Sequence, residues 1–429
     1  MKQYNVLVFP CGTEIANEII NSLQNNKYFK LFYASSEKVT YCSFRGKEVN
    51  LLPYVTDESF IEELERLIFT KKIDFIVPAH DDVAFILSQI ENEVEAKVIG
   101  QSKAVNDIVR FKDVTYKLFE NILPVGKVFK TQPLASEFPV FIKPKKGQGS
   151  FSSYKLSNLR DFEKFFSDYD IDDFVVMEYL PGSEFTIDCF SSNGALLYFG
   201  ARNREKTSRG ISVQSTFISD DKLNKHFEKY AKIISSHLNM HGVWFYQMKF
   251  DKNYELKLLE IGPRVSGTMM LNRARGVNFI ELAIYQKLGF DVEVIFNDIE
   301  ISLARALVPI YKHNVSYENL YIDFDDTLCI DEKIINTDLI KLIFQNKNEG
   351  KNTILISKNK KGNLSKILNQ YGISQIFDTI IHISDCDKKK DYMKDNSVLI
   401  DDSFAERKEA HQAGHYVFGI DNFNILFKD

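Results

Sequence analysis

The chain has 429 residues, of which 44% are hydrophobic and 26% are charged, as in soluble globular proteins. This length is too great for one hydrophobic core and predicts roughly three domains of ~150 residues each. The net charge of −5 gives no electrostatic case for nucleic acid as a partner.

The five cysteines are scattered along the chain with no CxxC spacing. This pattern argues against a zinc site and against a disulfide framework, and it suits a reducing compartment. The first apolar run is too short for a signal peptide, and no stretch approaches the ~18 apolar residues of a membrane span. These features predict a cytoplasmic protein with no membrane partner, and they leave its oligomeric state open.

Strands and helices are predicted to alternate over the first 100 residues. The expected elements are strands at 4–9, 30–34 and 75–78 and helices at 16–25 and 58–71. Such alternation favours a parallel sheet with helices on its faces, so residues 1–100 are predicted to form an α/β domain. The turn after the first strand contains Gly12 alone, which is much weaker than the glycine pattern of a dinucleotide site.

The middle of the chain, 101–315, has a different pattern. The expected elements are helices at 107–121 and 226–238 and a strand at 125–129. The apolar segments 138–150, 175–190 and 244–270 are typical of antiparallel strands joined by turns. The middle domain is therefore predicted to be α+β.

The alternation of strands and helices returns in the last part, 318–429. The expected elements are strands at 320–324, 353–357, 379–383, 398–401 and 416–420, with helices at 338–348, 362–371, near 391 and at 405–413. This pattern predicts a compact parallel α/β domain.

Polar residues stand at the ends of three apolar strands in the middle domain. In FPVFIKPKKGQGS (138–150), the strand ends on Lys143, and the glycine loop after it can lay N–H groups and ammonium charges over phosphates. In VVMEYLPG (175–182), the backbone from Glu178 to Leu180 can meet an adenine edge, and Glu184 beyond it can bind ribose hydroxyls. Taken alone, each segment is also compatible with a charged surface turn.

The third segment is LKLLEIGPR (256–264), in which a buried strand ends by presenting Glu260. A carboxylate there can hold Mg²⁺ between phosphates. Arg264 follows at a fixed offset and can stabilise a transferred phosphoryl group or a substrate carboxylate. A simple surface ion pair between the two residues is the alternative.

In this order and spacing, the three segments resemble the ATP-grasp superfamily, and the resemblance covers about 1–310. It implies a Rossmann-like pre-ATP-grasp domain followed by an ATP-grasp domain, with ATP and Mg²⁺ as cofactors. The implied roles are phosphate binding by Lys112 and Lys143, adenine contact by Glu178 and Leu180, ribose binding by Glu184, magnesium binding by Gln247 and Glu260, and catalysis by Arg264. The family often reads Glu-x-Asn-Pro-Arg, whereas this chain has Gly262 in place of the asparagine, and glycine supplies no side-chain ligand for a second metal ion.

Two other charged segments lie outside these motifs. The segment ARNREKTSRG (201–210) offers Arg202, Arg204 and Arg209, which are expected either to hold an anionic substrate or to lie in a solvated loop. The segment PAHDDV (78–83) resembles carbamoyl-phosphate-synthase-like members of the superfamily and fits a plain strand-to-helix turn equally well.

In the last domain, LYIDFDDTL (320–328) is a buried strand that stops on Asp323 and is followed by Asp325. One carboxylate at such a strand end can attack phosphorus while the other handles the leaving-group proton. Ser357 ends the next strand and can hold a phosphate oxygen. Asp401 and Asp402 end a later strand and can complete a magnesium site.

Lys388–Lys390 can supply an ammonium group beside these aspartates and Ser357. In their order and topology these elements resemble the haloacid dehalogenase (HAD) superfamily, and the resemblance covers about 318–425. The resemblance implies that Asp323 is a nucleophile that becomes an aspartyl phosphate and that Asp325 is the general acid/base, both also counted as magnesium ligands. Lys389 is favoured over Lys388 as the phosphate-binding lysine. The interval between Asp323 and Ser357 is too short for a large cap domain, so a capless, open site is predicted. A folded relative without activity and an acidic surface are the alternatives.

Together the two resemblances predict a bifunctional, magnesium-dependent enzyme. Its ATP-grasp part would ligate a small-molecule carboxylate to an amine or thiol, and its HAD part would act on a phosphorylated substrate. One alternative is a kinase-like enzyme that releases a phosphorylated product. The other is a non-catalytic nucleotide-binding scaffold, which is suggested by Gly262 in place of the usual ligand.

Overall fold

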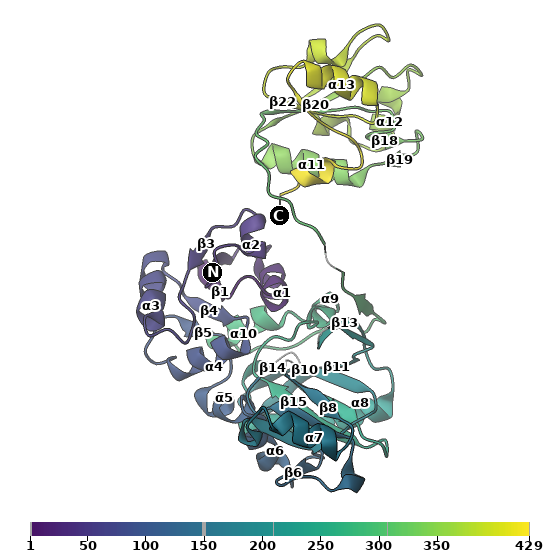
Figure 1. Ribbon diagram of the computed structural model, residues 1–429. Helices are drawn as coiled ribbons and strands as arrows, with labels where there is room; N and C mark the ends of the chain where they lie inside the picture. Colours follow the sequence, from purple (N-terminus) through teal and green to yellow (C-terminus); the bar gives the residue numbers. More distant parts are fainter. Residues whose placement is uncertain (1, 148–151, 209, 307, 429) are drawn as a thin grey trace. The chain divides into compact units, whose positions relative to one another are not determined.

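The computed structural model describes residues 2–147, 152–208, 210–306 and 308–428 (Figure 1). The chain divides into two compact units: the first consists mainly of residues up to Val308, and the second mainly of Pro309–Asp429. Among the described helices, none is long and apolar enough to cross a membrane.

The first unit begins with a five-stranded parallel sheet in the order β3-β2-β1-β4-β5. Its strands are β1 (Tyr4–Phe9), β2 (Phe29–Ser35), β3 (Val49–Leu51), β4 (Phe75–Pro78) and β5 (Lys97–Val98). Val6 and Val8 pack in one core cluster with α1 (Glu14–Leu23), whereas Leu7 and Phe9 pack in another with α3 (Phe60–Lys71) and α4 (Asp81–Gln89). Because successive side chains of a strand point to opposite faces, helices cover both sides of this sheet. The alternation in the sequence predicted this parallel arrangement.

Two short helices, α5 (Lys103–Val109) and α6 (Lys112–Phe119), replace the single helix predicted at 107–121. The chain is extended at Phe111, with φ −110° and ψ 115°, so the helical hydrogen-bond ladder is interrupted there. The break places Lys112 in the first turn of α6. The strand predicted at 125–129 is shorter, β6 (Val128–Phe129).

The rest of the first unit contains antiparallel sheets, as the sequence predicts. One sheet has the order β6-β9-β7-β8 and contains β7 (Val140–Pro144), β8 (Tyr154–Leu156) and β9 (Phe174–Glu178). Another has the order β11-β10-β14-β15 and contains β10 (Glu184–Ser192), β11 (Ala195–Asn203), β14 (Gly242–Phe250) and β15 (Leu256–Gly262). The helix α8 (Asp221–Leu238) packs Phe227, Ala231 and Ile234 onto this second sheet.

Three further strands form a small antiparallel sheet, β12 (Lys206–Ser208), β13 (Ile211–Thr216) and β16 (Ser302–Ala304). Two helices, α9 (Met270–Ala274) and α10 (Phe279–Lys287), follow β15. Phe279 and Ile284 of α10 share a core cluster with Ile19 of α1 and Val8 of β1. The parallel sheet and the antiparallel part therefore share one core.

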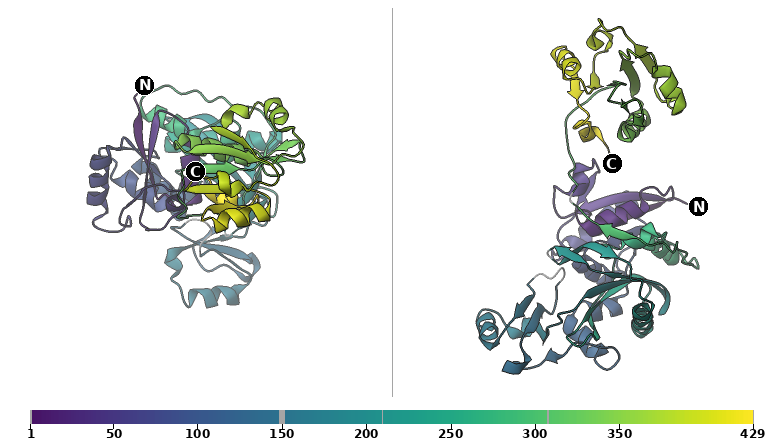
Figure 2. Two further views of the ribbon diagram at one scale, coloured as in Figure 1. Left: turned by 90° about the horizontal axis from the view of Figure 1, so that it is seen from above. Right: turned by 90° about the vertical axis from the view of Figure 1, so that its right-hand side faces the viewer.

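The second unit has a five-stranded parallel sheet in the order β21-β20-β17-β22-β23. Its strands are β17 (Asn319–Ile322), β20 (Asn352–Ser357), β21 (Thr379–His382), β22 (Ser397–Ile400) and β23 (Tyr416–Phe418). Leu320 and Ile322 pack with α11 (Thr337–Asn348) and α12 (Leu364–Gln370), while Tyr321 packs with α13 (Phe404–Gln412) on the other face. Figures 1 and 2 show this sheet as a layer with helices on either side.

Two smaller features of the second unit bear on its polar residues. The interval between β17 and β20 holds α11 and a hairpin of β18 (Cys329–Ile330) and β19 (Ile334–Ile335). The helix predicted near residue 391 is a short 3-10 helix, Lys389–Tyr392. Because the sheet is parallel, the residues that follow β17, β20 and β22 meet at one edge.

Candidate functional sites

One pocket of the first unit brings together residues predicted to bind ATP and Mg²⁺. Its lining includes Lys112, Lys143, Glu178, Leu180, Glu184, Gln247 and Glu260. Leu180 lies between β9 and β10, and the others come from α6, from two strands of the first antiparallel sheet and from three strands of the second. The space between these residues amounts to about 730 Å³, part of which is open to solvent.

The buried Lys143 and the half-buried Lys112 line one part of this pocket. The ammonium group of Lys143 donates to the carbonyl oxygen of Leu259 (3.2 Å) and to the hydroxyl of Tyr116. Lys112 donates to the carbonyl oxygen of Gly147 (2.8 Å). Burial, together with the charge of Lys112, lowers the pKa of Lys143 to about 7, and burial also lowers the pKa of Lys112. Two desolvated cations with few anionic partners are suited to bind phosphate oxygens.

The pKa of Lys143 leads to a prediction about nucleotide binding. Above pH 7 the buried amine is largely neutral in the free protein, and phosphate oxygens beside it would favour the ammonium form. We therefore expect binding of ADP to take up as much as ~1 proton at pH 8, and its affinity to fall as the pH rises above 7. Calorimetry in buffers with different ionisation enthalpies measures this uptake. Lys143→Met should remove it, and binding of ADP without proton uptake by the unchanged protein would contradict the prediction.

The acidic residues of the pocket are held by neighbouring groups. Glu184 pairs with Arg204 (Nε to Oε1, 2.9 Å) and with Lys249 (Nζ to Oε2, 3.5 Å). The carboxylate of Glu178 accepts a hydrogen bond from the backbone N–H of Lys127 (2.8 Å). Both carboxylates are thus fixed at the pocket wall, where Glu178 ends β9 and Glu184 begins β10.

Gln247 and Glu260 lie opposite each other on β14 and β15. With its amide oriented to satisfy its neighbours, Gln247 donates from nitrogen to Glu260 Oε1 (3.3 Å) and accepts on oxygen from Arg204 Nη1 (2.7 Å). Mg²⁺ requires oxygen ligands, so the carboxylate of Glu260 fits a magnesium site. In this orientation the side-chain oxygen of Gln247 faces a guanidinium group, which competes with the ligand role that the resemblance implied.

The position of Gly262 is filled by a neighbouring ring. A Cβ atom on Gly262 would lie 2.9 Å from Cδ1 of Phe245 and closer still to Cε1 and Cζ. Phe245 is the cross-strand partner of Gly262 and is buried. No side chain fits between the two strands at this point unless the phenyl ring moves. An asparagine at position 262 therefore has no room in this packing.

The close approach of Gly262 and Phe245 predicts a stability effect. Gly262→Ala should lower the free energy of unfolding by about 1–3 kcal/mol, because the added methyl group overpacks a rigid core. Urea denaturation measures the change. Gly100→Ala is the matched control, because its Cβ would lie 3.8 Å from the nearest side-chain atom. Phe245→Leu should restore part of the loss, and a Gly262→Ala variant as stable as the control would refute this packing argument.

Arg264 lies in an adjacent cavity that also has Lys112 and Glu260 in its lining. Its guanidinium group forms two hydrogen bonds with Asp81, at 2.7 Å each. Asp81 belongs to the PAHDDV segment and stands in the first turn of α4. Although burial opposes it, Arg264 holds the pKa of Asp81 below its usual range. The catalytic role predicted for Arg264 would thus involve a guanidinium group already paired with this carboxylate.

At Arg202 the structure differs from both predictions made for the segment 201–210. Arg202 is almost fully buried and pairs with Asp188 (Nε to Oδ2, 2.8 Å; Nη2 to Oδ1, 3.2 Å). Its charge is neutralised inside the core, so both expectations for it, an anion-binding residue and a solvated loop, are wrong. Arg204 instead lies beside Glu184 and Gln247 of the pocket. Arg209 and the glycine-loop residues Gln148–Ser150 lie outside the described residues.

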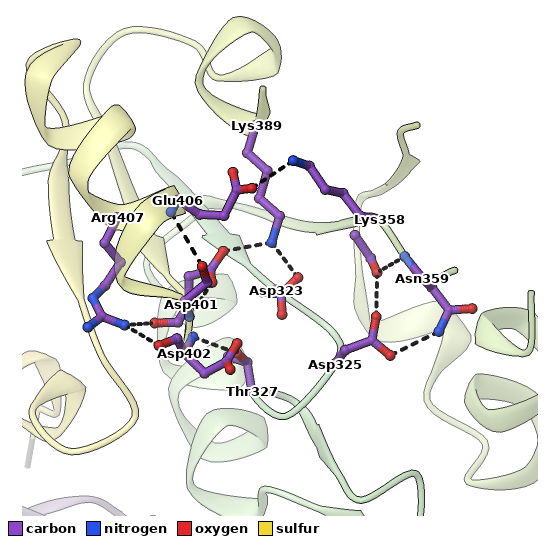
Figure 3. Close-up of polar contacts among 12 residues, drawn as sticks. Asp323, Asp325, Thr327, Lys358, Asn359, Lys389, Asp401, Asp402, Glu406 and Arg407 are labelled. Atoms are coloured by element: carbon purple, nitrogen blue, oxygen red, sulfur yellow. Dashed lines mark hydrogen bonds and ion pairs between the residues drawn. The ribbon is translucent and has the colours of Figure 1, made fainter. Parts of the chain in front are cut away.

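In the second unit, oxygen atoms of Asp323, Asp401 and Asp402 lie within 4.8 Å of one another (Figure 3). Lys389 bridges two of them, with Nζ 2.5 Å from Asp323 Oδ1 and 2.6 Å from Asp401 Oδ2. Lys388 instead pairs with Glu409 (3.0 Å), so the structure brings the favoured lysine into the site. Burial raises the pKa of Asp323 to about 7, against the pull of Lys389. Three carboxylates and one ammonium leave a negative excess that suits a divalent cation with oxygen ligands.

Asp325 does not join this carboxylate cluster. Its carboxylate accepts hydrogen bonds from the hydroxyl of Ser357 (3.3 Å) and the amide of Asn359 (2.9 Å). Asn359 lies on the side of Asp325 away from Asp402 (Figure 3). The structure therefore does not support Asp325 as a side-chain ligand of the same ion, because the hydroxyl and the amide hold its carboxylate apart. Asp325 stands two positions after Asp323, and its role as acid/base group stays a prediction.

Asn359 and Thr327 are parts of this site that the sequence pattern did not assign to a role. Asn359 holds Asp325 and also accepts from the N–H of Asn363 (3.0 Å) at the start of α12. Thr327 accepts from the N–H of Asp402 (2.9 Å) and so fixes the loop after β22. The only signal for Asn359 was a polar residue shortly after a strand end.

Comparison with known proteins supports the interpretation of the first unit. A family model described as "ATP-grasp in the biosynthetic pathway with Ter operon" matches residues 170–304. No curated protein sequence matches the chain.

Several solved structures are similar to this chain. The biotin carboxylase domain of 2-oxoglutarate carboxylase from Hydrogenobacter thermophilus, in complex with MgADP, ADP and bicarbonate, has a TM-score of 0.60 at 14% identity and covers 70% of this chain and 73% of its own. N5-carboxyaminoimidazole synthetase from Staphylococcus aureus with ADP has a TM-score of 0.56 at 15% identity. The match covers 69% of this chain and 80% of the synthetase. L-amino acid ligase from Bacillus licheniformis has a TM-score of 0.53 at 15% identity. The match covers 67% of this chain and 75% of the ligase. Residues 170–304 thus match an ATP-grasp family model, and the similar structures share a mixed α/β fold over 67–70% of this chain.

Proposed function

We propose that the first unit is a ligase that uses ATP to phosphorylate a small-molecule carboxylate and then joins the acyl group to an amine. The observation that carries this proposal is the convergence, in one pocket, of residues assigned to the phosphates, adenine, ribose and magnesium. The family match over residues 170–304 supports it, as do relatives whose structures hold ADP or MgADP.

Different residues of the pocket bind the nucleotide and neutralise its charge. Lys112 and Lys143 bind the phosphate oxygens, and Glu184 binds the ribose hydroxyls. When bound at Glu260, Mg²⁺ would offset the negative charge of the phosphates. Transfer of the terminal phosphoryl group to the carboxylate turns a poor leaving group into a good one. The amine then attacks the acyl carbon and displaces phosphate. Preorganised cations in a desolvated pocket are the main source of catalysis in such a scheme.

We further propose that the second unit is a phosphohydrolase related to the HAD superfamily. Asp323 attacks phosphorus, the ester bond breaks, and Asp325 gives a proton to the leaving oxygen. Water then hydrolyses the aspartyl phosphate, with Asp325 accepting its proton. The observations that favour this reaction are the pairing of Lys389 with Asp323 and the cluster of three carboxylates. Magnesium bound to that cluster would screen its charge from the incoming phosphate.

A screen of ADP release tests the ligase proposal, with carboxylic acids crossed against amines and amino sugars. We expect ADP release that requires both an acid and an amine. ADP release without an amine, with a stable phosphorylated product, would favour the kinase-like alternative. Nucleotide binding with no turnover across the whole panel would favour a scaffold.

A further inference from the structure

We propose that the nucleotide pocket of the first unit works with one divalent cation, held by Glu260, and that Arg204 supplies a fixed positive charge in place of a second ion. This inference rests on the proposed function, because it assumes that the pocket binds a nucleotide. It goes further by assigning a role to Arg204 and by fixing the metal stoichiometry of the site.

The first observation is the packing around Gly262. The phenyl ring of Phe245 takes the space that a side chain on Gly262 would need. The guanidinium carbon of Arg264 lies 5.6 Å from the centroid of the same ring. The ring is therefore a packed part of the site, and it removes one position from which a ligand for a second ion could come.

The second observation concerns Gln247. With the amide turned so that both of its polar atoms are satisfied, the oxygen accepts from Arg204 at 2.7 Å and the nitrogen donates to Glu260 at 3.3 Å. A metal ion could use this amide only if the oxygen left a charge-assisted hydrogen bond, and the ion would then lie close to the guanidinium group. Among the described residues of the chain, the one group of three or more potential carboxylate, histidine or cysteine ligands is the cluster around Asp323 in the second unit.

The third observation is that Arg204 is held rigidly from three sides. Its side chain is 10% exposed, its Nε lies 2.9 Å from Glu184, and its Nη2 donates to the carbonyl oxygen of Gly210 (2.6 Å). Its own backbone N–H donates to the carbonyl oxygen of Glu184 (3.0 Å). A guanidinium group stays charged at any accessible pH, so this cation is permanent. It is a positioning residue, which holds Glu184 and Gln247 and places positive charge beside them.

The charges of the pocket also favour a single divalent cation. Three glutamates line the pocket with Lys112, Lys249 and Lys143, and because the pKa of Lys143 is lowered to about 7, Arg204 adds a permanent positive charge beside a partial one. The four negative charges of ATP and one Mg²⁺ would leave two negative charges, which suits a pocket of this kind. A second divalent ion near Gln247 would lie beside Arg204, and Glu184, the carboxylate next to it, is already paired with that guanidinium group.

Counting bound ions tests the inference directly. The full chain is titrated with Mn²⁺ in the absence and presence of AMP-PNP, and free Mn²⁺ is measured by electron paramagnetic resonance. Only the ions gained on addition of AMP-PNP are counted, which removes any ion bound by the second unit. We expect a gain of one ion per chain. A gain of two ions would overturn the inference while leaving the proposed function intact, whereas failure of AMP-PNP to bind would overturn both.

Variants of Arg204 provide a second test. In Arg204→Met we expect the affinity for AMP-PNP at low Mn²⁺ to fall about tenfold, and to recover as Mn²⁺ is raised, because the oxygen of Gln247 is then free to accept an ion. Arg204→Lys keeps the charge and should keep the count of one ion. Arg160→Met, in the exposed part of α7 (Leu159–Phe166), is the matched control and should bind like the unchanged protein. Unchanged affinity in Arg204→Met, or a loss that Mn²⁺ does not reverse, would overturn the role of Arg204.

Discussion

Asp323→Asn should lower the hydrolysis of phosphate esters by at least ~10³-fold, because it removes the nucleophile from the proposed reaction. An amide cannot form the aspartyl phosphate, yet it keeps the shape of the side chain and can still accept a hydrogen bond from Lys389. The rate is measured with p-nitrophenyl phosphate at saturating magnesium. ADP release by the first unit should be unchanged, because Asp323 belongs to a separate compact unit.

Asp326→Asn is the matched control for this experiment. It is the same substitution three positions further on, at an exposed residue with a positive φ of 51°, a conformation that asparagine tolerates well. Its phosphatase rate should stay near that of the unchanged protein. Equal rates for the two variants would show that the hydrolysis does not pass through Asp323. Loss of ADP release in Asp323→Asn would argue against independent chemistry in the two units.

The second large effect is expected for Lys143→Met, which should reduce ADP release by about 10²–10³-fold. The substitution removes an ammonium group from a desolvated wall of the nucleotide pocket, where charge on the phosphates has most need of stabilisation. Methionine has a similar length, and burying it costs less than burying a charge, so the fold should be retained. The Tyr116 hydroxyl keeps a partner in the carbonyl oxygen of Leu259. ADP release is followed with a coupled assay.

Lys164→Met on the exposed surface of α7 is the control for loss of a lysine in the same unit. A thermal melt of both variants separates loss of folding from loss of chemistry. If Lys143→Met turned over like Lys164→Met, the assignment of this pocket to the phosphates would be wrong.

The residues that the sequence located best are those at strand ends. Lys143, Glu260, Asp323 and Ser357 each stand at or just after the end of a run of apolar residues, and a run of that kind predicts where a strand stops. In the parallel sheet of the second unit the strand ends meet at one edge, so the convergence of Asp323 and Ser357 follows from the pattern. Lys143 and Glu260 belong to two different antiparallel sheets, and their convergence was expected from the resemblance to a known superfamily.

What the sequence could not supply was the partner of each charged group. Asp81 and Arg264 are 183 positions apart, and nothing local to either residue predicts their pairing. The sequence places Arg202 and Arg204 in one charged segment, whereas β11 extends through Asn203 and sets Arg202 in the core and Arg204 beside the pocket. Charge alone cannot distinguish a solvated arginine from a buried one, because the difference depends on contacts from distant segments.

The edge of the parallel sheet in the second unit also sets the spacing of the residues proposed to act there. Neighbouring strands are separated by about 4.8 Å, and β17 lies between β20 and β22. The spacing between Asp323, Ser357 and Asp401 is therefore set largely by backbone hydrogen bonds, and the side chains add only the final reach. Loss of one functional group should leave the remaining ones in register. Substitutions at this edge can thus change which reaction occurs without dismantling the frame, so a variant that has lost one activity remains a usable scaffold for another.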